Sequence, residues 1–187
     1  MRSERRYLSV LMCDLSESTE LSDTLDADVF AKIIDTVINI SADEIERFDG
    51  FISAYQGDSV IALFGYPTAL EHHAAQAVRA GLSITQKIHQ YSKSLEFSVA
   101  VRVGIASGTT LVSPVVRKGT ISQTTAYGYV PNLSGRLQST AELNTVYIDD
   151  RTHRLTNRFF TYDDLGYSYF KGFEKPKRIW KVKSSSI

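Results

Sequence analysis

The sequence contains little of what several large protein classes require. Its 187 residues include a single cysteine, Cys13, so a disulfide framework within the chain is excluded and a reducing, cytoplasmic location is expected. No apolar run is long enough to span a bilayer, and residues 1–6 lack the apolar segment of a signal peptide. The 21 basic residues balance the 21 acidic ones. This absence of a basic excess argues against a bulk nucleic-acid-binding protein.

The chain does contain enough apolar sequence for one sizeable folded domain. The hydrophobic share is 43%, which is an ordinary value for a globular core. No internal repeat, interdomain linker or low-complexity block interrupts it. We therefore expect a single domain over residues 1–187, and we expect it to be one part of a longer protein that carries regulatory domains.

Hydrophobic periodicity predicts both helices and strands in the first half of the chain. Residues 7–14 form an apolar run typical of a buried strand, and residues 16–25 form a turn that leads into a short helix. Helical spacing of apolar residues predicts helices over 28–48 and 71–91. Two short apolar runs on either side of residues 56–58 predict a hairpin.

The second half continues this mixture. Alternating apolar residues predict a strand over 97–105, a turn at Ser107 and Gly108 follows, and another strand is predicted over 109–116. The remaining predicted elements are a helix from 129 or 130 to 139, a strand over 144–148, a short helix over 151–156 and closing strands within 158–182. Interleaved elements of both kinds predict an α+β fold, with helices packed on a mostly antiparallel sheet.

Two aspartates stand at the ends of predicted strands. Asp14 closes the first apolar run, and Asp58 lies in the turn of the hairpin. Taken singly, each suits a helix cap or a turn, but two convergent carboxylates hold the hard divalent ions that drive phosphoryl and nucleotidyl transfer. The adjacent His72 and His73 are interpreted as solvated helix residues, because neighbours on a helix point in different directions.

Several segments, in order, resemble the catalytic domain of class III nucleotidyl cyclases, the adenylate and guanylate cyclase family. They are residues 5–19, 55–65, 77–81, 101–108 and 127–137. An ordered set of motifs is far more specific than any one of them. The resemblance implies the ferredoxin-like cyclase fold and conversion of ATP to 3′,5′-cyclic AMP and pyrophosphate. It also implies two Mg²⁺ or Mn²⁺ ions at each site.

The resemblance assigns roles to individual residues. Asp14 and Asp58 are the implied metal ligands, with the Leu15 carbonyl as a further ligand. The turn after Asp14 is implied to offer backbone N–H groups to the triphosphate through Ser16, Glu17, Ser18 and Thr19. Glu17 departs from the family, which commonly has glycine at this position.

The helix predicted from residue 129 is implied to carry the catalytic pair. Asn132 would orient the ribose, and Arg136, four residues further on the same helix face, would neutralise charge on the α-phosphate. In the family the metal aspartates come from one subunit and this pair from the other. A homodimer of this chain would therefore hold two equivalent sites.

Base selection is where the chain departs most from the family. Adenylate cyclases commonly have lysine at the position of Ala54 and aspartate at that of Thr125; threonine occurs there in bacterial branches. The guanylate pattern of glutamate and cysteine is also absent. The resemblance to the bacterial branches favours ATP as the substrate. The alternative is a degenerate cyclase homology domain that binds a nucleotide or a partner with little or no turnover. A diguanylate cyclase or polymerase relative fits less well, because residues 56–60 do not match the diguanylate signature.

Overall fold

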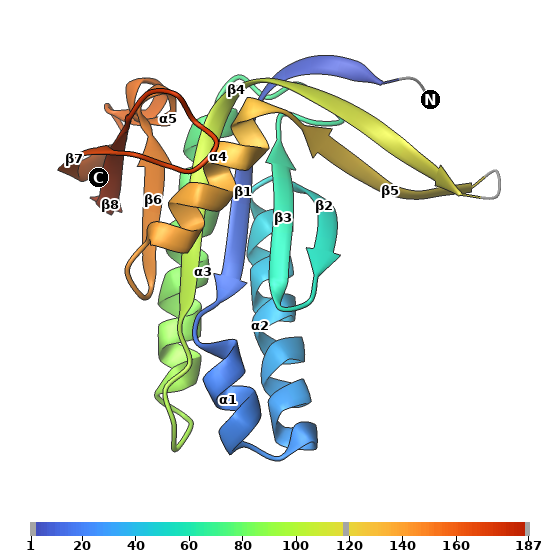
Figure 1. The fold of residues 1–187 in the computed structure, drawn as a ribbon, viewed down its shortest axis with the longest axis vertical. Helices are drawn as coiled ribbons and strands as arrows, with labels where there is room; N and C mark the ends of the chain where they lie inside the picture. The colour runs from blue at the N-terminus through green and yellow to red at the C-terminus, as the bar shows by residue number, and fades with distance from the viewer. Residues whose placement is uncertain (1–2, 118–119, 186–187) are drawn as a thin grey trace.

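The computed structural model describes residues 3–117 and 120–185 (Figure 1). These residues form an eight-stranded sheet in the order β2-β3-β1-β4-β6-β8-β7, with β5 paired to β4 outside this path. The strands are β1 (Glu4–Leu15), β2 (Phe51–Gln56), β3 (Ser59–Phe64), β4 (Val101–Arg117), β5 (Thr120–Tyr127), β6 (Thr145–Asp149), β7 (Phe160–Ser168) and β8 (Lys177–Ser185). The helices are α1 (Ser18–Thr24), α2 (Ala27–Arg47), α3 (His73–Ser92), α4 (Tyr129–Thr140) and α5 (Asp150–Thr156).

The sheet separates two hydrophobic clusters. The larger one joins the sheet to α2 and α3, and the smaller one joins the opposite face to α4. Figure 1 shows α4 crossing in front of the central strands, with α2 and α3 behind them. Among the described strand pairs only β4 and β6 run parallel. The predicted α+β fold, a mostly antiparallel sheet covered by helices, is confirmed.

One sequence prediction about the centre of the sheet is wrong. Ser107 and Gly108 do not form a turn, because β4 runs through them as one strand that pairs with β1 from Val101 to Val112. Ser107 is fully buried, and its hydroxyl lies 2.7 Å from each of the Ser9 and Thr152 hydroxyl oxygens. A polar residue whose hydrogen bonds are made inside the core gives the same local sequence pattern as a residue in a turn.

Two further differences come from polar segments. Strand β5 was not predicted, since its threonines, serine and glutamine lack apolar alternation. His73 is not solvated as predicted: it is 7% exposed, and its Nδ1 lies 2.8 Å from the Ser9 hydroxyl oxygen. His73 is held by a hydrogen bond to a residue 64 positions away, which the local sequence does not reveal. Strand β5 forms a hairpin with the preceding β4, and its Thr124 carbonyl also accepts a hydrogen bond from the Ser53 hydroxyl on β2.

Helix α4 lies unusually close to the middle of the sheet. The Ser134 hydroxyl is buried against the carbonyl oxygens of Val10 and Gly104, at 3.1 and 2.9 Å. A Cβ atom on Gly104 would lie 2.3 Å from the backbone nitrogen of Gln138. The lack of a side chain at Gly104 therefore allows the helix to approach β4 and determines where its outer face lies.

We predict that Gly104→Ala destabilises the fold strongly. The added methyl group meets backbone atoms of α4, which cannot move without disrupting the helix, so a loss of about 3 kcal/mol is expected, at the upper end for overpacking. Urea unfolding measures the change, with Thr109→Ala on the exposed part of β4 as the control. Equal midpoints for both variants would contradict the close approach.

Candidate functional site

The sheet brings the two aspartates together at one end of β1. Asp14 pairs with Ser59 across β1 and β3, and its Oδ1 accepts a 2.8 Å hydrogen bond from the Ser59 hydroxyl. Asp58 directly precedes Ser59 in the β2–β3 turn. Burial raises the pKa of Asp14, and the negative charge of Asp58 raises it further, against the lowering effects of Ser59 and Arg102. The hairpin thus places two mutually repelling carboxylates side by side.

The donor set at this position suits a hard divalent cation. Carboxylate oxygens are preferred ligands of Mg²⁺ and Mn²⁺, and a cation would relieve the repulsion between Asp14 and Asp58. Within residues 3–117 and 120–185, no group of three or more histidine, cysteine, aspartate or glutamate side chains could hold a metal. The Leu15 side chain has no donor atom and is buried in the core; only the main-chain carbonyl of Leu15 could contribute a ligand. Two carboxylates leave coordination positions for phosphate oxygens, which fits ions that bind together with a nucleotide.

The segment after Asp14 turns sharply into α1. Glu17 has a left-handed backbone, with φ 59 and ψ 29, and its side chain is exposed. This conformation favours glycine, which explains why glycine is common at this position in the family. The N–H of Ser16 donates to the carbonyl of Ala100 at 2.8 Å, so it is already bonded. In the described part of the chain, the buried Ser16 hydroxyl has no hydrogen-bond partner.

Asn132 and Arg136 line a separate pocket of about 560 Å³ between α4 and the loop of residues 169–176. Both side chains are exposed on the outer face of α4. The same pocket contains Lys171, which sequence reasoning missed because only folding brings the β7–β8 loop beside the helix. Neither Asp14 nor Asp58 lines this pocket. The chain therefore presents the carboxylates and the basic side chains at different places.

Ala54 lines a third hollow, of about 400 Å³, between β2 and β5. A register shift between Ile52 and Ala54 interrupts the β2–β3 pairing here. Thr125 is on the neighbouring strand and accepts a 3.2 Å hydrogen bond from the Gln123 side-chain amide, which itself lines the hollow. Gln123 was also missed, because β5 was not predicted. The hollow is polar on the β5 side and apolar at Ala54.

The chain belongs to the family of adenylate and guanylate cyclase catalytic domains, whose family model matches residues 2–184. The fold agrees with solved cyclases. It superposes on the adenylyl cyclase CyaB from P. aeruginosa with a TM-score of 0.91 at 25% identity, covering 99% of this chain and 97% of that one. The guanylyl cyclase Cya2 gives a TM-score of 0.91 at 24% identity, covering 100% and 96%.

Curated relatives are much longer than this chain. An uncharacterized protein of Rhizobium meliloti is 28% identical over 180 residues, which are 96% of this chain and 17% of that protein. Adenylate cyclase 1 of the same organism is 25% identical over 138 residues, or 72% and 21%. This chain therefore spans about a fifth of their length. None of its described helices has the length and apolar character needed to cross a membrane.

We predict that Asp14→Asn stabilises the metal-free protein at neutral pH while it removes a metal ligand. A carboxyl whose pKa is raised by folding costs stability when ionised, and that cost appears as pH rises through the ordinary carboxyl pKa of about 4. The gain in Tm should therefore shrink as the pH is lowered toward that value. Thermal unfolding in a chelator measures it.

The matched control is Asp164→Asn. The hydrogen bond from Arg178 lowers the pKa of Asp164, so this carboxylate favours folding at neutral pH and its loss should leave Tm equal or lower. A lower Tm for Asp14→Asn at neutral pH would contradict the repulsive pair.

Proposed function

We propose that this domain is an adenylate cyclase, which converts ATP to 3′,5′-cyclic AMP and pyrophosphate. The observation that carries the proposal is the adjacency of Asp14 and Asp58 at the end of β1, together with a second pocket that holds Asn132 and Arg136. The choice of ATP is supported by the sequence likeness to Adenylate cyclase 1, which is named for that activity. The fold alone does not choose the base, because the adenylyl cyclase CyaB and the guanylyl cyclase Cya2 superpose equally well.

The residues divide the chemistry between them. Two Mg²⁺ or Mn²⁺ ions, held by Asp14, Asp58 and the Leu15 carbonyl, would lower the pKa of the ribose 3′-hydroxyl and balance triphosphate charge. Asn132 would hold the ribose so that the 3′-oxygen faces the α-phosphorus. Arg136 would donate to the α-phosphate oxygens as negative charge grows on them. Lys171 adds a second cation for the β- and γ-phosphates.

The backbone of the turn after Asp14 would complete the phosphate contacts. Because the Ser16 N–H is already bonded to Ala100, the remaining donors are the N–H groups of Glu17, Ser18 and Thr19 and the free Ser16 hydroxyl. The first N–H groups of a helix have no partner within it. The Glu17 side chain is exposed to solvent, where water and salt screen its negative charge from the phosphates.

A homodimer would join the two half-sites. Within one protomer the aspartates do not line the pocket of Asn132 and Arg136. A two-fold axis would place the aspartates of each copy opposite the pocket of the other, giving two equivalent sites. Ala54 and Thr125 would then border the base, with the Gln123 amide beside them.

The second candidate function is a nucleotide-binding domain with little turnover. It is favoured by Ala54, whose methyl group offers no hydrogen bond to a base, so selectivity between ATP and GTP would be weak. Incubation of the protein with Mn²⁺ and either nucleotide, followed by identification of the product by mass, separates the two functions. Formation of a cyclic nucleotide supports the enzyme, and unchanged nucleotide supports the binding domain.

We predict that Asn132→Ala and Arg136→Ala each lower kcat by about a hundredfold to a thousandfold, since each removes a donor placed for the transition state. Turnover is measured by cyclic AMP formation at saturating ATP. Thr140→Ala, at the exposed end of the same helix and outside the lining of this pocket, serves as the control. Unchanged turnover in both variants would refute these roles.

We also predict that two inactive variants restore activity when mixed. An Asp14→Ala protomer keeps its basic pocket, and an Arg136→Ala protomer keeps its aspartates, so a mixed dimer contains one intact site. At equal concentrations, about half of the dimers are mixed and each has one of two sites, which gives about a quarter of wild-type activity. The absence of any recovery, with exchange of subunits shown by size and label, would refute a shared site.

A further inference from the structure

A lysine between two aromatic rings lies at the base of the loop that carries Lys171. Lys177 is the first residue of β8 and pairs with Ser168, the last residue of β7, so residues 169–176 begin and end beside it. Its Nζ lies 5.0 Å from the centre of the Tyr129 ring and 5.5 Å from that of Phe173. The two rings meet edge to face, with centres 5.3 Å apart. We call Lys177, Tyr129 and Phe173 the aromatic clamp.

The clamp connects the loop to the catalytic helix. Tyr129 is the first residue of α4, while Phe173 lies in the loop two residues after Lys171. Both rings line the pocket that contains Asn132, Arg136 and Lys171. A cation over an aromatic face is attracted by the electron density of the ring, so Lys177 holds the two walls of this pocket together.

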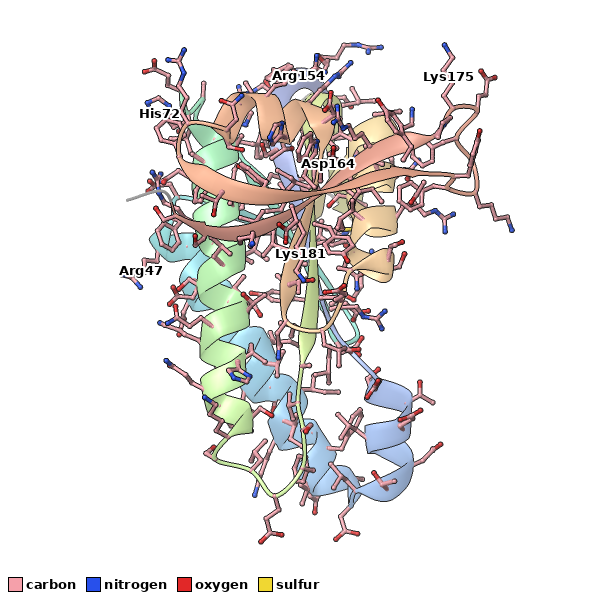
Figure 2. The ribbon with its side chains drawn as sticks, turned by 90° about the vertical axis from the view of Figure 1, so that its left-hand side faces the viewer. Arg47, His72, Arg154, Asp164, Lys175 and Lys181 are labelled. Atoms are coloured by element: carbon pink, nitrogen blue, oxygen red, sulfur yellow. The ribbon has the colours of Figure 1, made fainter. Side chains whose placement is uncertain are left out.

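Lys171 and Gly172 lie in the middle of a turn between Phe170 and Phe173, which the Phe173 N–H closes by donating to the Phe170 carbonyl at 3.1 Å. Phe170 and Phe173 both pack against the hydrophobic cluster under α4. Lys171 and Gly172 are exposed, and Gly172 has a φ of 92 that non-glycine residues rarely adopt. Figure 2 shows Lys175 pointing outward from the same loop. The position of Lys171 therefore depends on how the two ends of the turn, Phe170 and Phe173, are held, and Lys177 contacts Phe173.

We propose that Lys177 is a positioning residue which, through Tyr129 and Phe173, holds Lys171 across the pocket from Arg136 to bind the triphosphate of a nucleotide. The proposal rests on the proposed function, because it concerns the same pocket. Lys177 itself contacts the rings and acts through Lys171. Without the clamp, Lys171 would become ordered only when the nucleotide binds. The entropy lost in that ordering would weaken nucleotide binding.

The first test replaces the ammonium group and keeps most of the chain length. For Lys177→Met we expect KM for the manganese nucleotide to rise about two- to fivefold, the size of one exposed cation–π contact, with kcat changed less than twofold. Lys177→Arg keeps the cation over the rings and should retain the wild-type KM. Lys175→Met removes the same charge from the loop and should also leave KM unchanged.

A double-mutant cycle separates positioning from direct attraction of the phosphates. If Lys177 acts through Lys171, then Lys177→Met has no further effect on KM in a Lys171→Met background. Equal effects of Lys177→Met with and without Lys171 would overturn the proposal, since Lys177 would then act as a charge of its own. Tyr129→Leu removes the aromatic ring on α4 that Lys177 contacts, and it should raise KM in the same way as Lys177→Met.

Two measurements do not need turnover. Trypsin cleavage after Lys171 should be faster in Lys177→Met than in the wild type, Lys177→Arg or Lys175→Met. Titration with a non-hydrolysable ATP analogue and Mn²⁺ should show a matching rise in Kd. If the wild type forms no cyclic product, the proposed function fails while these two measurements still decide the clamp. Unchanged cleavage, or faster cleavage without weaker analogue binding, would overturn it.

Discussion

The close packing of α4 on the central strands is the constraint on which the rest of the site depends. Gly104 leaves no side chain between β4 and the helix, and the Ser134 hydroxyl fills the gap with hydrogen bonds to two strand carbonyls. These contacts with backbone atoms of the strands determine how closely α4 lies against the sheet and which of its faces points outward. Its outer face carries Asn132 and Arg136 into a pocket whose other wall is the β7–β8 loop.

The two aspartates of the site are held close together at a cost in folding free energy. Asp14 and Asp58 repel one another at the end of β1, and burial adds to that penalty. Arg136 and Lys171 both line the second pocket, and no acidic side chain is among the described residues that line it. A divalent cation would relieve the repulsion between the two aspartates, and a polyphosphate would complement the two basic side chains. The structure thus holds binding groups in place before any ligand arrives.

Much of the fold could be predicted from the sequence, because most elements have a clear period. Helix α2 and the hairpin of β2 and β3 follow local apolar spacing, and both were predicted nearly to the residue. The prediction was wrong at Ser107 and Gly108 and at His73, where polar groups are buried. Those groups are satisfied by residues 45 to 98 positions away in the chain, and no local window contains that information.

The sequence alone determined the family and the α+β class, since these follow from ordered motifs and local spacing. It also singled out the two aspartates and the asparagine–arginine pair as candidate site residues. Only the tertiary structure decided that the two groups occupy different places on one protomer, that Lys171 joins the basic pocket and that Gln123 borders Ala54. The physical reason is that strand pairing and helix packing bring together segments with no sequence relationship. Their proximity depends on backbone contacts such as those at Gly104.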